Sequence, residues 1–347
     1  MISVVIPNYN RADLLGACLA SLRAQTYRDF EVIVVDNGSD DGSSEMAAKD
    51  FPEVRLIRLE ENKGFSAAVN RGIKKSVGEL VALLNNDAEA DPAWLSELYS
   101  ASAAHPEAGF FASKILFYDR HDIIDTVCDC FSVAGFGYKK GWGEIDKGQY
   151  DHLKYVFGAC GGAAAYRRTM LDAVAQGGEY FDEEYFAFGE DLDISFRAQS
   201  MGYRCVAVPG ARVYHRIRAT AGNSSRMAIF LGYRNFMLTV IKNFPARSIV
   251  KHLPSLVAFW CLSILADFVK TRRFIVLKAY LAAVRMMPSM SVKRKMIASK
   301  RKIGIAQIDA MLDRGWLATW LRLGINTARV RKVLSGQSRR PVMEDKA

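Results

Sequence analysis

The stretches Ile2-Ser-Val-Val-Ile6 and Glu31-Val-Ile-Val-Val-Asp36 decide the fold, because each is a short β-branched run that stops at turn-forming residues. Between them, residues 11–24 place apolar side chains at helical spacing. Further strands are expected at 54–59 and 79–84, and further helices at 43–49 and 65–76. Alternation of strands and helices at this spacing predicts an α/β fold with a mostly parallel sheet flanked by helices.

The 347-residue chain divides by charge. Its net charge is +10, but 22 Lys and Arg against 5 Asp and Glu lie from Lys242 onward, which leaves +17 there and −7 on residues 1–241. We therefore expect a catalytic domain over residues 1–241 and a basic helical region over residues 242–347. The partner of the basic region should be anionic, either lipid headgroups or nucleic acid.

The cysteines and the N-terminus favour a cytoplasmic protein. The six cysteines form no CxxC pair, which favours reduced thiols over a disulfide framework or a zinc site. Residues 1–7 lack a basic leader and predict a strand rather than a signal peptide.

Polar side chains follow several of the expected strands, at the sheet edge where parallel α/β proteins bind ligands. Asp36 can accept hydrogen bonds from a nucleobase or a ribose, or it can close the turn that continues to Ser39. Asp87 follows Asn85 and Asn86. It can bind a divalent cation that offsets the charge of a diphosphate, or it can cap a helix that begins near residue 91.

Three carboxylates cluster in Gly189-Glu-Asp-Leu-Asp193, close to the aromatic residues of segment 181–188. Apolar neighbours and like charges raise the pKa of a carboxyl group toward the range of a general base. The alternative is a helix N-terminus, which favours acidic side chains for its own stability.

His215 ends an apolar stretch and is a candidate second ligand for Mn²⁺ or Mg²⁺ beside Asp87, although a single histidine is more often a hydrogen-bonded structural residue. Four arginines follow, and they could form a mobile clamp on phosphates or a solvated face. They are Arg216, Arg218, Arg226 and Arg234.

Two further segments are expected near a site. Residues 135–151 are rich in glycine and charge and predict a mobile loop that could cover it. Residues 157–166 are mostly small, which permits either close approach of the backbone to a ligand or a tightly packed strand.

In this order, the motifs resemble those of family 2 glycosyltransferases with the GT-A fold, in the rhamnosyltransferase-like branch that builds O-antigen and other cell-envelope glycans. The resemblance covers residues 1–240. The matching runs are Val4–Asn10, Val34–Ser39, Asn62–Phe65, Leu83–Asp87, Phe181–Phe186, Glu190-Asp191 and Tyr214-His215. Each run is a weak signal, whereas the ordered set is specific.

The resemblance implies a nucleotide-diphosphate sugar as donor, with dTDP-rhamnose or a UDP-hexose expected. Pro7, Tyr9 and Asp36 would hold the nucleobase and ribose, with Asn37 beside them.

The resemblance also implies a metal site and a base. Asn85, Asn86 and Asp87 occupy the place of the family's metal-binding DXD signature, with Asp87 as the metal ligand and His215 in the metal shell. Asn85 stands where many members have Asp, which removes one charge from the site. Asp191 would be the catalytic base, with Glu190 beside it, in a single displacement that inverts the anomeric carbon.

The basic tail is similar to this branch as well, whose members often carry C-terminal amphipathic helices on the inner membrane face. Residues 254–269 are apolar apart from Ser255, Ser263 and Asp267, a stretch shorter than the ~20 residues that span a bilayer. With their basic flanks they are expected to lie in the interface; a membrane span and a soluble appendage are the alternatives. An acceptor linked to polyprenyl diphosphate would be within reach there.

Two other classes of function are weighed against this one. A nucleotidyltransferase would share the sheet and the metal, but it normally carries a Gly-rich basic loop after the first strand, which Asn8-Tyr-Asn-Arg11 is not. A binding protein, either an inactive homologue or a module whose basic tail holds nucleic acid, is the other class, and the presence of Asp87, Glu190, Asp191 and His215 argues against an inactive homologue. The expected partners are therefore a nucleotide-diphosphate sugar, a lipid-linked or glycan acceptor and an anionic membrane surface, without nucleic acid.

Overall fold

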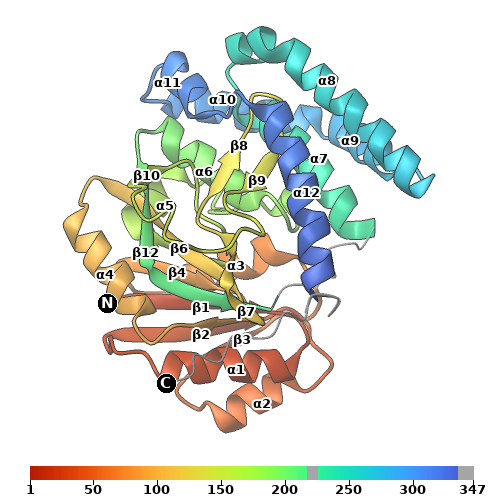
Figure 1. Cartoon of the computed structure of the whole chain (residues 1–347). Coiled ribbons are helices and arrows are strands. Elements are labelled where there is room, and N and C mark those ends of the chain that lie inside the picture. The colour runs from red at the N-terminus through yellow and green to blue at the C-terminus, as the bar shows by residue number, and fades with distance from the viewer. Residues whose placement is uncertain (217–225, 335–347) are drawn as a thin grey trace.

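The computed structural model describes residues 1–216 and 226–334, and a ten-stranded mixed sheet forms its centre (Figure 1). The strands are β1 Ile2–Asn8, β2 Phe30–Asp36, β3 Arg55–Arg58, β4 Leu80–Leu84, β5 Ala88–Ala90, β6 Ala108–Phe117, β7 Arg120–Thr126, β8 Asp129–Phe131, β9 Gly137–Lys139, β10 Tyr155–Val156, β11 Ala163–Arg167 and β12 Arg204–His215. The sheet runs in the order β10-β12-β6-β11-β4-β1-β2-β3, with β5 paired to β12 and β7 to β6, while β8 and β9 form a separate hairpin.

The four N-terminal strands pair in parallel, as the sequence predicted. The register aligns Asn8 with Asp36 across β1 and β2, and Val5 with Leu83 across β1 and β4. The polar residues that follow these strands therefore meet at one edge of the sheet. β11 enters antiparallel between β4 and β6, so the sheet is parallel in its N-terminal half and mixed beyond it.

Helices cover both faces of the sheet, which confirms the expected fold class (Figure 1). Helices α1 Ala12–Arg23, α2 Ser43–Asp50 and α4 Trp94–Ala104 pack on one face. Helices α3 Phe65–Lys75, α5 Arg168–Val174 and α6 Glu190–Ser200 pack on the other. Because each helix buries its apolar stripe against continuous Val, Ile and Leu runs, the sheet is held between two apolar cores.

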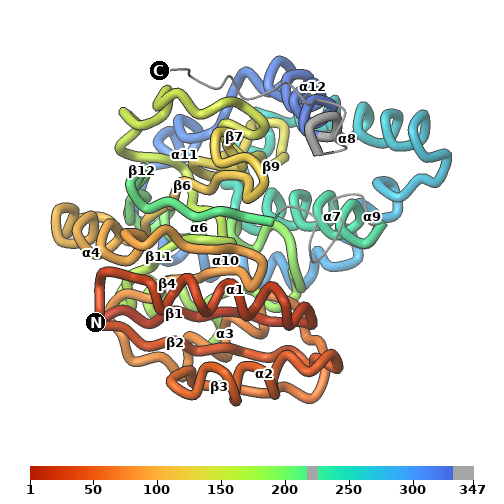
Figure 2. The backbone as a smooth tube through the Cα atoms, turned by 60° about the horizontal axis from the view of Figure 1, so that its bottom comes forward, coloured from red at the N-terminus to blue at the C-terminus, as the bar shows by residue number. Residues whose placement is uncertain are grey.

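The C-terminal helices lie to one side of these layers (Figure 2). They are α7 Arg226–Asn243, α8 Ala246–Thr271, α9 Ile275–Arg285, α10 Met287–Lys300, α11 Ile305–Met311 and α12 Trp316–Leu334. A third apolar core joins them to the catalytic half, since Phe131 of β8 and Phe196 of α6 pack with Val240, Phe244 and Leu256 of the helical region.

The structure adds detail to two features of the helical region. The division expected between residues 241 and 242 falls inside α7, which continues to Asn243 without a break. The apolar stretch over residues 254–269 belongs to a longer helix of 26 residues, α8, with Pro254 inside it.

Candidate active site

A cavity of about 830 Å³ lies at the carboxyl ends of β1 and β4, between these strands and the start of α6. The loop after β9, the end of β12, and helices α7 and α12 complete its walls. It is lined by the expected residues Pro7, Tyr9, Asn37, Asn85, Asn86, Asp87, Glu190, Asp191 and His215. Residues from distant parts of the chain thus converge on one cavity, and Asp36 is the exception.

Asp36 lies behind the cavity wall and is buried. Its carboxylate accepts hydrogen bonds from Asn8 Nδ2 at 3.1 Å and from the Ser39 hydroxyl, so it closes the turn after β2. The Asn8 side-chain oxygen accepts a hydrogen bond from Asn86 Nδ2 at 2.7 Å. Asp36 therefore does not line the cavity itself. It holds the Asn8 side chain, and Asn8 in turn holds the Asn86 amide in the cavity wall.

Asn37 lines the cavity and holds the turn that precedes α3. Its side chain donates to the Asn62 side-chain oxygen and the Gly64 carbonyl, both at 3.0 Å, and accepts from the Lys63 backbone N–H at 3.0 Å. Gly64 has a φ of 87°, and a Cβ there would lie 2.5 Å from the carbonyl oxygen of Phe186. The turn before α3 therefore requires glycine to pack against the loop that leads into α6.

A chain of charged groups runs through His215. Its Nε2 lies 3.2 Å from Asp87 Oδ1, and its Nδ1 lies 2.8 Å from Asp125 Oδ2. Lys139 Nζ lies 2.9 Å from the other oxygen of Asp125. Burial would lower the pKa of His215, but hydrogen bonds to Asp125 and Asp87 raise it to about 9. Burial would likewise raise the pKa of Asp125, but Lys139 and His215 lower it to about 2.

Asp87 and His215 would fit a divalent cation that displaces the proton from His215 Nε2, because an imidazole binds a metal only in its neutral form. An imidazole whose second nitrogen is held by a carboxylate, as Asp125 holds His215, is the usual arrangement at protein metal sites. A carboxylate with an imidazole suits Mn²⁺ or Mg²⁺. The alternative role for Asp87 as a helix cap is wrong, because β5 follows it and α4 is preceded by Ala93.

Asp191 stands at the start of α6, facing the cavity, and its Oδ2 accepts the Gly161 backbone N–H at 3.2 Å. Glu190 beside it is buried, and burial together with the charge of Asp191 holds the pKa of Glu190 well above its usual range. Asp193 points away from the cavity into the protein, where it pairs with Lys242. The three carboxylates of this motif therefore lie in different environments.

The loop before α6 is held in a strained form. Phe186 and Phe188 have φ values of 65° and 70°, a region that disfavours bulky side chains and costs about 1–3 kcal/mol per residue. Asn235 of α7 compensates, since its Nδ2 lies within 2.9 Å of the carbonyl oxygens of Tyr185, Ala187 and Phe188. Helix α7 thereby fixes the approach of the chain to Glu190 and Asp191.

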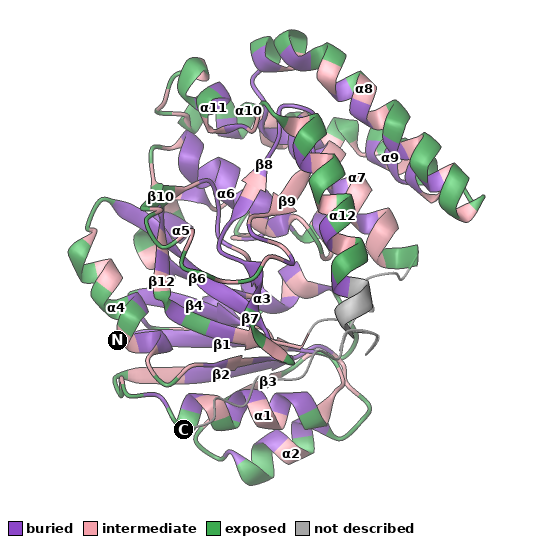
Figure 3. Cartoon of the chain, viewed as in Figure 1, coloured by how far each residue is buried: buried purple, intermediate pink, exposed green. Residues whose placement is uncertain are grey.

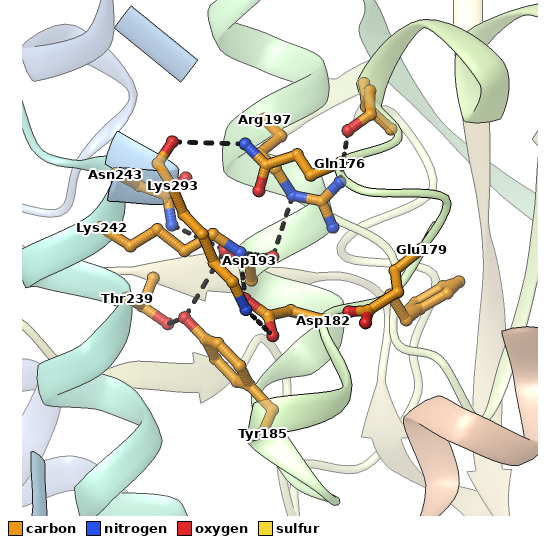
Figure 4. A network of polar contacts seen from close by, with 12 residues as sticks. Gln176, Glu179, Asp182, Tyr185, Asp193, Arg197, Thr239, Lys242, Asn243 and Lys293 are labelled. Atoms are coloured by element: carbon orange, nitrogen blue, oxygen red, sulfur yellow. Dashed lines mark hydrogen bonds and ion pairs between the residues drawn. The ribbon is translucent and has the colours of Figure 1, made fainter. Parts of the chain in front are cut away.

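A buried ion network anchors α6 to the C-terminal helices (Figure 4). Lys242 Nζ of α7 lies 2.9 Å from Asp193 Oδ2 and 2.7 Å from Asp182 Oδ2, and Lys242 and Asp193 are completely buried. Arg197 completes the pairing with Asp193 at 2.9 Å, and Lys293 of α10 binds Asp182 at 2.6 Å. The helix that carries Asp191 is therefore held by residues of the basic region.

The expected arginine clamp is not assembled among the described arginines. Arg216 pairs with Glu89 at 2.9 Å and stacks on Tyr118. Arg234 donates to the Glu184 and Tyr185 carbonyls, and Arg226 begins α7 away from the cavity lining. Arg218 lies outside the described residues.

Sequence reasoning missed Asp125, Asp129 and Lys139, which belong to no recognised run. The only signal was the composition of residues 135–151, expected to form a mobile loop over a site. Part of this segment is β9, and Gly137, Tyr138, Lys139 and Trp142 do line the cavity. The small-residue segment 157–166 contributes Cys160, Gly161 and Gly162 to the wall and continues into β11.

Comparison with known proteins agrees with this geometry. The sequence model of glycosyl transferase family 2 matches residues 3–174. The O-antigen biosynthesis protein RfbC of Myxococcus xanthus is 30% identical, over 63% of this chain and 17% of that protein. The N-acetylglucosaminyl-diphospho-decaprenol L-rhamnosyltransferase of Mycobacterium tuberculosis is 28% identical, over 64% of this chain and 78% of that protein.

The chain belongs to glycosyl transferase family 2, and the resemblance seen in its motifs is confirmed. Its matched segment spans about a quarter or less of the length of the first curated relatives. Among solved structures, the mannosyltransferase PcManGT of Pyrobaculum calidifontis, in complex with GDP-Man and Mn²⁺, has a TM-score of 0.51 and 17% identity, over 97% of this chain and 88% of that chain. The fold is GT-A.

The buried network predicts that Lys242→Met destabilises the protein by about 3–5 kcal/mol, because Asp182 and Asp193 would lose their shared cation in a dry site. Urea unfolding at pH 7 measures the change. Lys295→Met, at an exposed position of α10, is the matched control and should change stability little.

The pH dependence supplies a second readout of the same pairing. Burial would raise the pKa values of Asp182 and Asp193, but Lys242 lowers both, so the stabilisation is present above the unfolded pKa of about 3.9 and is lost as pH falls below it. The cost of Lys242→Met should therefore shrink in acid. An equal cost at pH 7 and in acid would contradict the assignment.

Proposed function

We propose that this chain transfers a sugar, rhamnose or a hexose, from a nucleotide-diphosphate donor to a hydroxyl group of a lipid-linked glycan acceptor in cell-envelope polysaccharide synthesis. The observation that carries the proposal is the convergence of Asp87, His215 and Asp191 on one cavity whose far wall is apolar. The carboxylate and imidazole suit a charged diphosphate, while Asp191 is placed to receive a proton.

In the proposed reaction the acceptor hydroxyl gives its proton to Asp191 as its oxygen attacks the sugar C1. The bond from C1 to the diphosphate oxygen breaks on the opposite face, and the nucleoside diphosphate leaves with the electron pair. One displacement of this kind inverts the anomeric carbon. Asp87 and His215 would hold Mn²⁺ or Mg²⁺, which offsets the negative charge of the leaving group when bound.

The donor would lie against the N-terminal strands. Pro7, Tyr9 and Asn37 line the cavity near the ends of β1 and β2, and Asn85 and Asn86 follow β4. Their amide and ring groups suit a nucleobase and a ribose, with Asp36 supporting the wall through Asn8.

The opposite wall supports an amphiphilic acceptor. Met227, Leu231 and Phe236 of α7 and Leu323 of α12 line the cavity there. A lipid-linked sugar would place its polar end at Asp191 and its apolar part along these side chains.

The outer face of the helical region supports binding to a membrane. Helix α8 turns Ser248, His252, Leu256, Phe259, Ser263 and Asp267 toward the protein. Its exposed apolar side chains are Val250, Leu253, Val257, Leu262, Leu265 and Val269, and Leu277, Leu281 and Val284 of α9 are exposed as well (Figure 3). Exposed apolar rows beside exposed Lys270, Arg272, Arg273 and Lys278 fit an anionic lipid interface.

We propose that α8 lies on the inner face of the cell membrane and does not cross it. By length and composition the helix could cross a bilayer. Its buried stripe, however, packs on the protein: Asp267 accepts the Val276 backbone N–H at the start of α9, and Ser263 bonds with the Tyr280 hydroxyl at 2.9 Å. Because one face of α8 packs on the protein, only its opposite face is available to lipid. This favours a peripheral arrangement of the helix over a membrane span.

The first test is a donor screen with Mn²⁺ across dTDP-, UDP- and GDP-sugars, followed by Asp191→Asn with the preferred donor. The variant should lose at least about 100-fold in kcat because it lacks the base, while its donor affinity stays close to wild type. Asp172→Asn, at an exposed site of α5, is the control. Normal turnover by Asp191→Asn would remove it from the base role, and wild-type donor binding without turnover would identify an inactive homologue.

The second test concerns the cation. Asp87→Ala should bind the donor at least about tenfold more weakly than wild type in Mn²⁺, because the cation that bridges protein and diphosphate loses its carboxylate ligand. In EDTA the two proteins should bind the donor equally. Isothermal calorimetry measures both conditions, and unchanged affinity of the variant in Mn²⁺ would count against the metal site.

The third test is partition of the full chain between buffer and vesicles, with phosphatidylcholine alone and with added phosphatidylglycerol. A chain ending at residue 241 is unsuitable because it lacks Lys242. Replacing Lys270, Arg272 and Arg273 with Gln should weaken binding to anionic vesicles about 100-fold, at about 1 kcal/mol per charge.

An apolar variant and a control complete that test. Val257→Glu with Leu265→Glu should also reduce binding, whereas Val77→Glu, at a site 69% exposed on the catalytic half, should not. Binding that is insensitive to all of these changes, or tight DNA binding instead, would overturn the membrane assignment.

A further inference from the structure

Asp129 is a buried carboxyl group in the cavity wall that the proposed reaction has not used. It begins β8, it is 5% exposed, and its backbone exchanges hydrogen bonds with Gly158 on the segment that leads to Gly161. One carboxyl oxygen of Asp129, one of Asp191 and the Cys160 thiol lie within 4.8 Å of one another. Two carboxyl groups this close in a cavity wall repel one another when both are ionised, and a cation or a proton on one of them relieves that repulsion.

The charged groups around Asp129 do not supply that cation directly. Lys139 acts on it from β9, but the Lys139 ammonium group is hydrogen bonded to both oxygens of Asp125. The other titratable neighbours are the Tyr166 hydroxyl and the thiols of Cys128, Cys130, Cys160 and Cys205. Burial, followed by the charge of Asp191, holds the pKa of Asp129 well above its usual range.

The proton belongs on Asp129 because the two carboxyl groups differ in their surroundings. Asp191 accepts backbone N–H groups from Gly161 and, at 2.8 Å, from Leu192. It also stands in the first turn of α6, where a negative charge is favoured. The carboxylate of Asp191 therefore has two backbone donors of its own.

We propose that Asp129 is the positioning partner of the catalytic base: it keeps its own proton at neutral pH and donates it in a hydrogen bond to the Asp191 carboxylate. This inference rests on the proposed function. In the reaction Asp191 takes the proton of the acceptor hydroxyl, while the proton of Asp129 stays where it is. Asp129 thereby orients the lone pair of Asp191 toward the acceptor. Because Asp129 stays neutral, it places no second negative charge beside the base.

The test is the pH dependence of kcat for wild type, Asp129→Asn and Asp129→Leu. Wild-type activity should fall on the alkaline side as Asp129 loses its proton, stops donating and repels Asp191. Asp129→Asn should keep kcat at pH 7 within about threefold, because the amide donates the same bond, and should lose that alkaline limb. Asp129→Leu should lower kcat about 10- to 100-fold with little change in donor KM, because the bond to a charged acceptor is gone.

Controls separate the outcomes. Asp122→Asn, at an exposed position of β7, should leave the profile as in wild type, and thermal unfolding reports whether each variant folds. If Asp129→Leu fails to fold, the proposal is still tested by whether the pH profile of kcat for Asp129→Asn lacks the alkaline limb. Equal Mn²⁺ concentrations for half-activation in wild type and Asp129→Asn support a shared proton, whereas a tenfold difference would make Asp129 a metal ligand and overturn the proposal.

Two further results would overturn it. Asp129→Asn as inactive as Asp191→Asn at every pH would make Asp129 the base itself. An alkaline limb that is unchanged in Asp129→Asn would show that its proton is not involved. Wild-type protein that transfers no sugar from any donor would instead reject the proposed function, so the two failures are distinguishable.

Discussion

The ammonium group of Lys242, buried between Asp182 and Asp193, connects the two halves of this protein. Asp193 lies two residues beyond Asp191 on α6, and Lys242 lies near the end of the helix that leads into α8. A buried cation between two carboxylates tolerates little displacement, since separation would leave charges unpaired in a dry interior. The orientation of α6, and with it the cavity wall, therefore depends on the C-terminal helices being in place.

Acidic groups are concentrated in the cavity wall and directly behind it, and each has different polar partners. Asp36 receives hydrogen bonds from a serine and an asparagine, Asp125 pairs with Lys139 and His215, and Asp87 faces His215. Glu190 and Asp129 have raised pKa values because burial and the neighbouring Asp191 disfavour their ionised forms. These distinct environments fit the roles of metal ligand, base and hydrogen-bond donor that we propose for Asp87, Asp191 and Asp129.

Helix α8 reverses the usual surface pattern of a helix, because several polar side chains face the protein and apolar side chains face outward. Helix α8 directs Ser248, His252, Ser263 and Asp267 inward, where Asp267 caps α9, and leaves Val, Leu and Phe residues of α8 and the turn that follows exposed. In water such a face is unfavourable, whereas against lipid it is stabilising. The same helical region supplies the apolar cavity wall and holds the α6 helix, so the proposed membrane contact, acceptor binding and catalysis share one structural element.

The sequence by itself determined the parallel N-terminal strands, the helices that flank them, the family and nine of the residues that line the cavity, because β-branched runs, turn residues and ordered motifs are local features. It also indicated the basic, apolar character of the tail from composition alone. Only the tertiary structure decided that Asp36 acts through Asn8, that Asp125 and Lys139 support His215, that Asp129 faces Asp191, and that Lys242 belongs with α6. These pairings join residues 14 to 90 positions apart, and such contacts follow from how β7, β8 and α7 pack against the sheet, which no local pattern specifies.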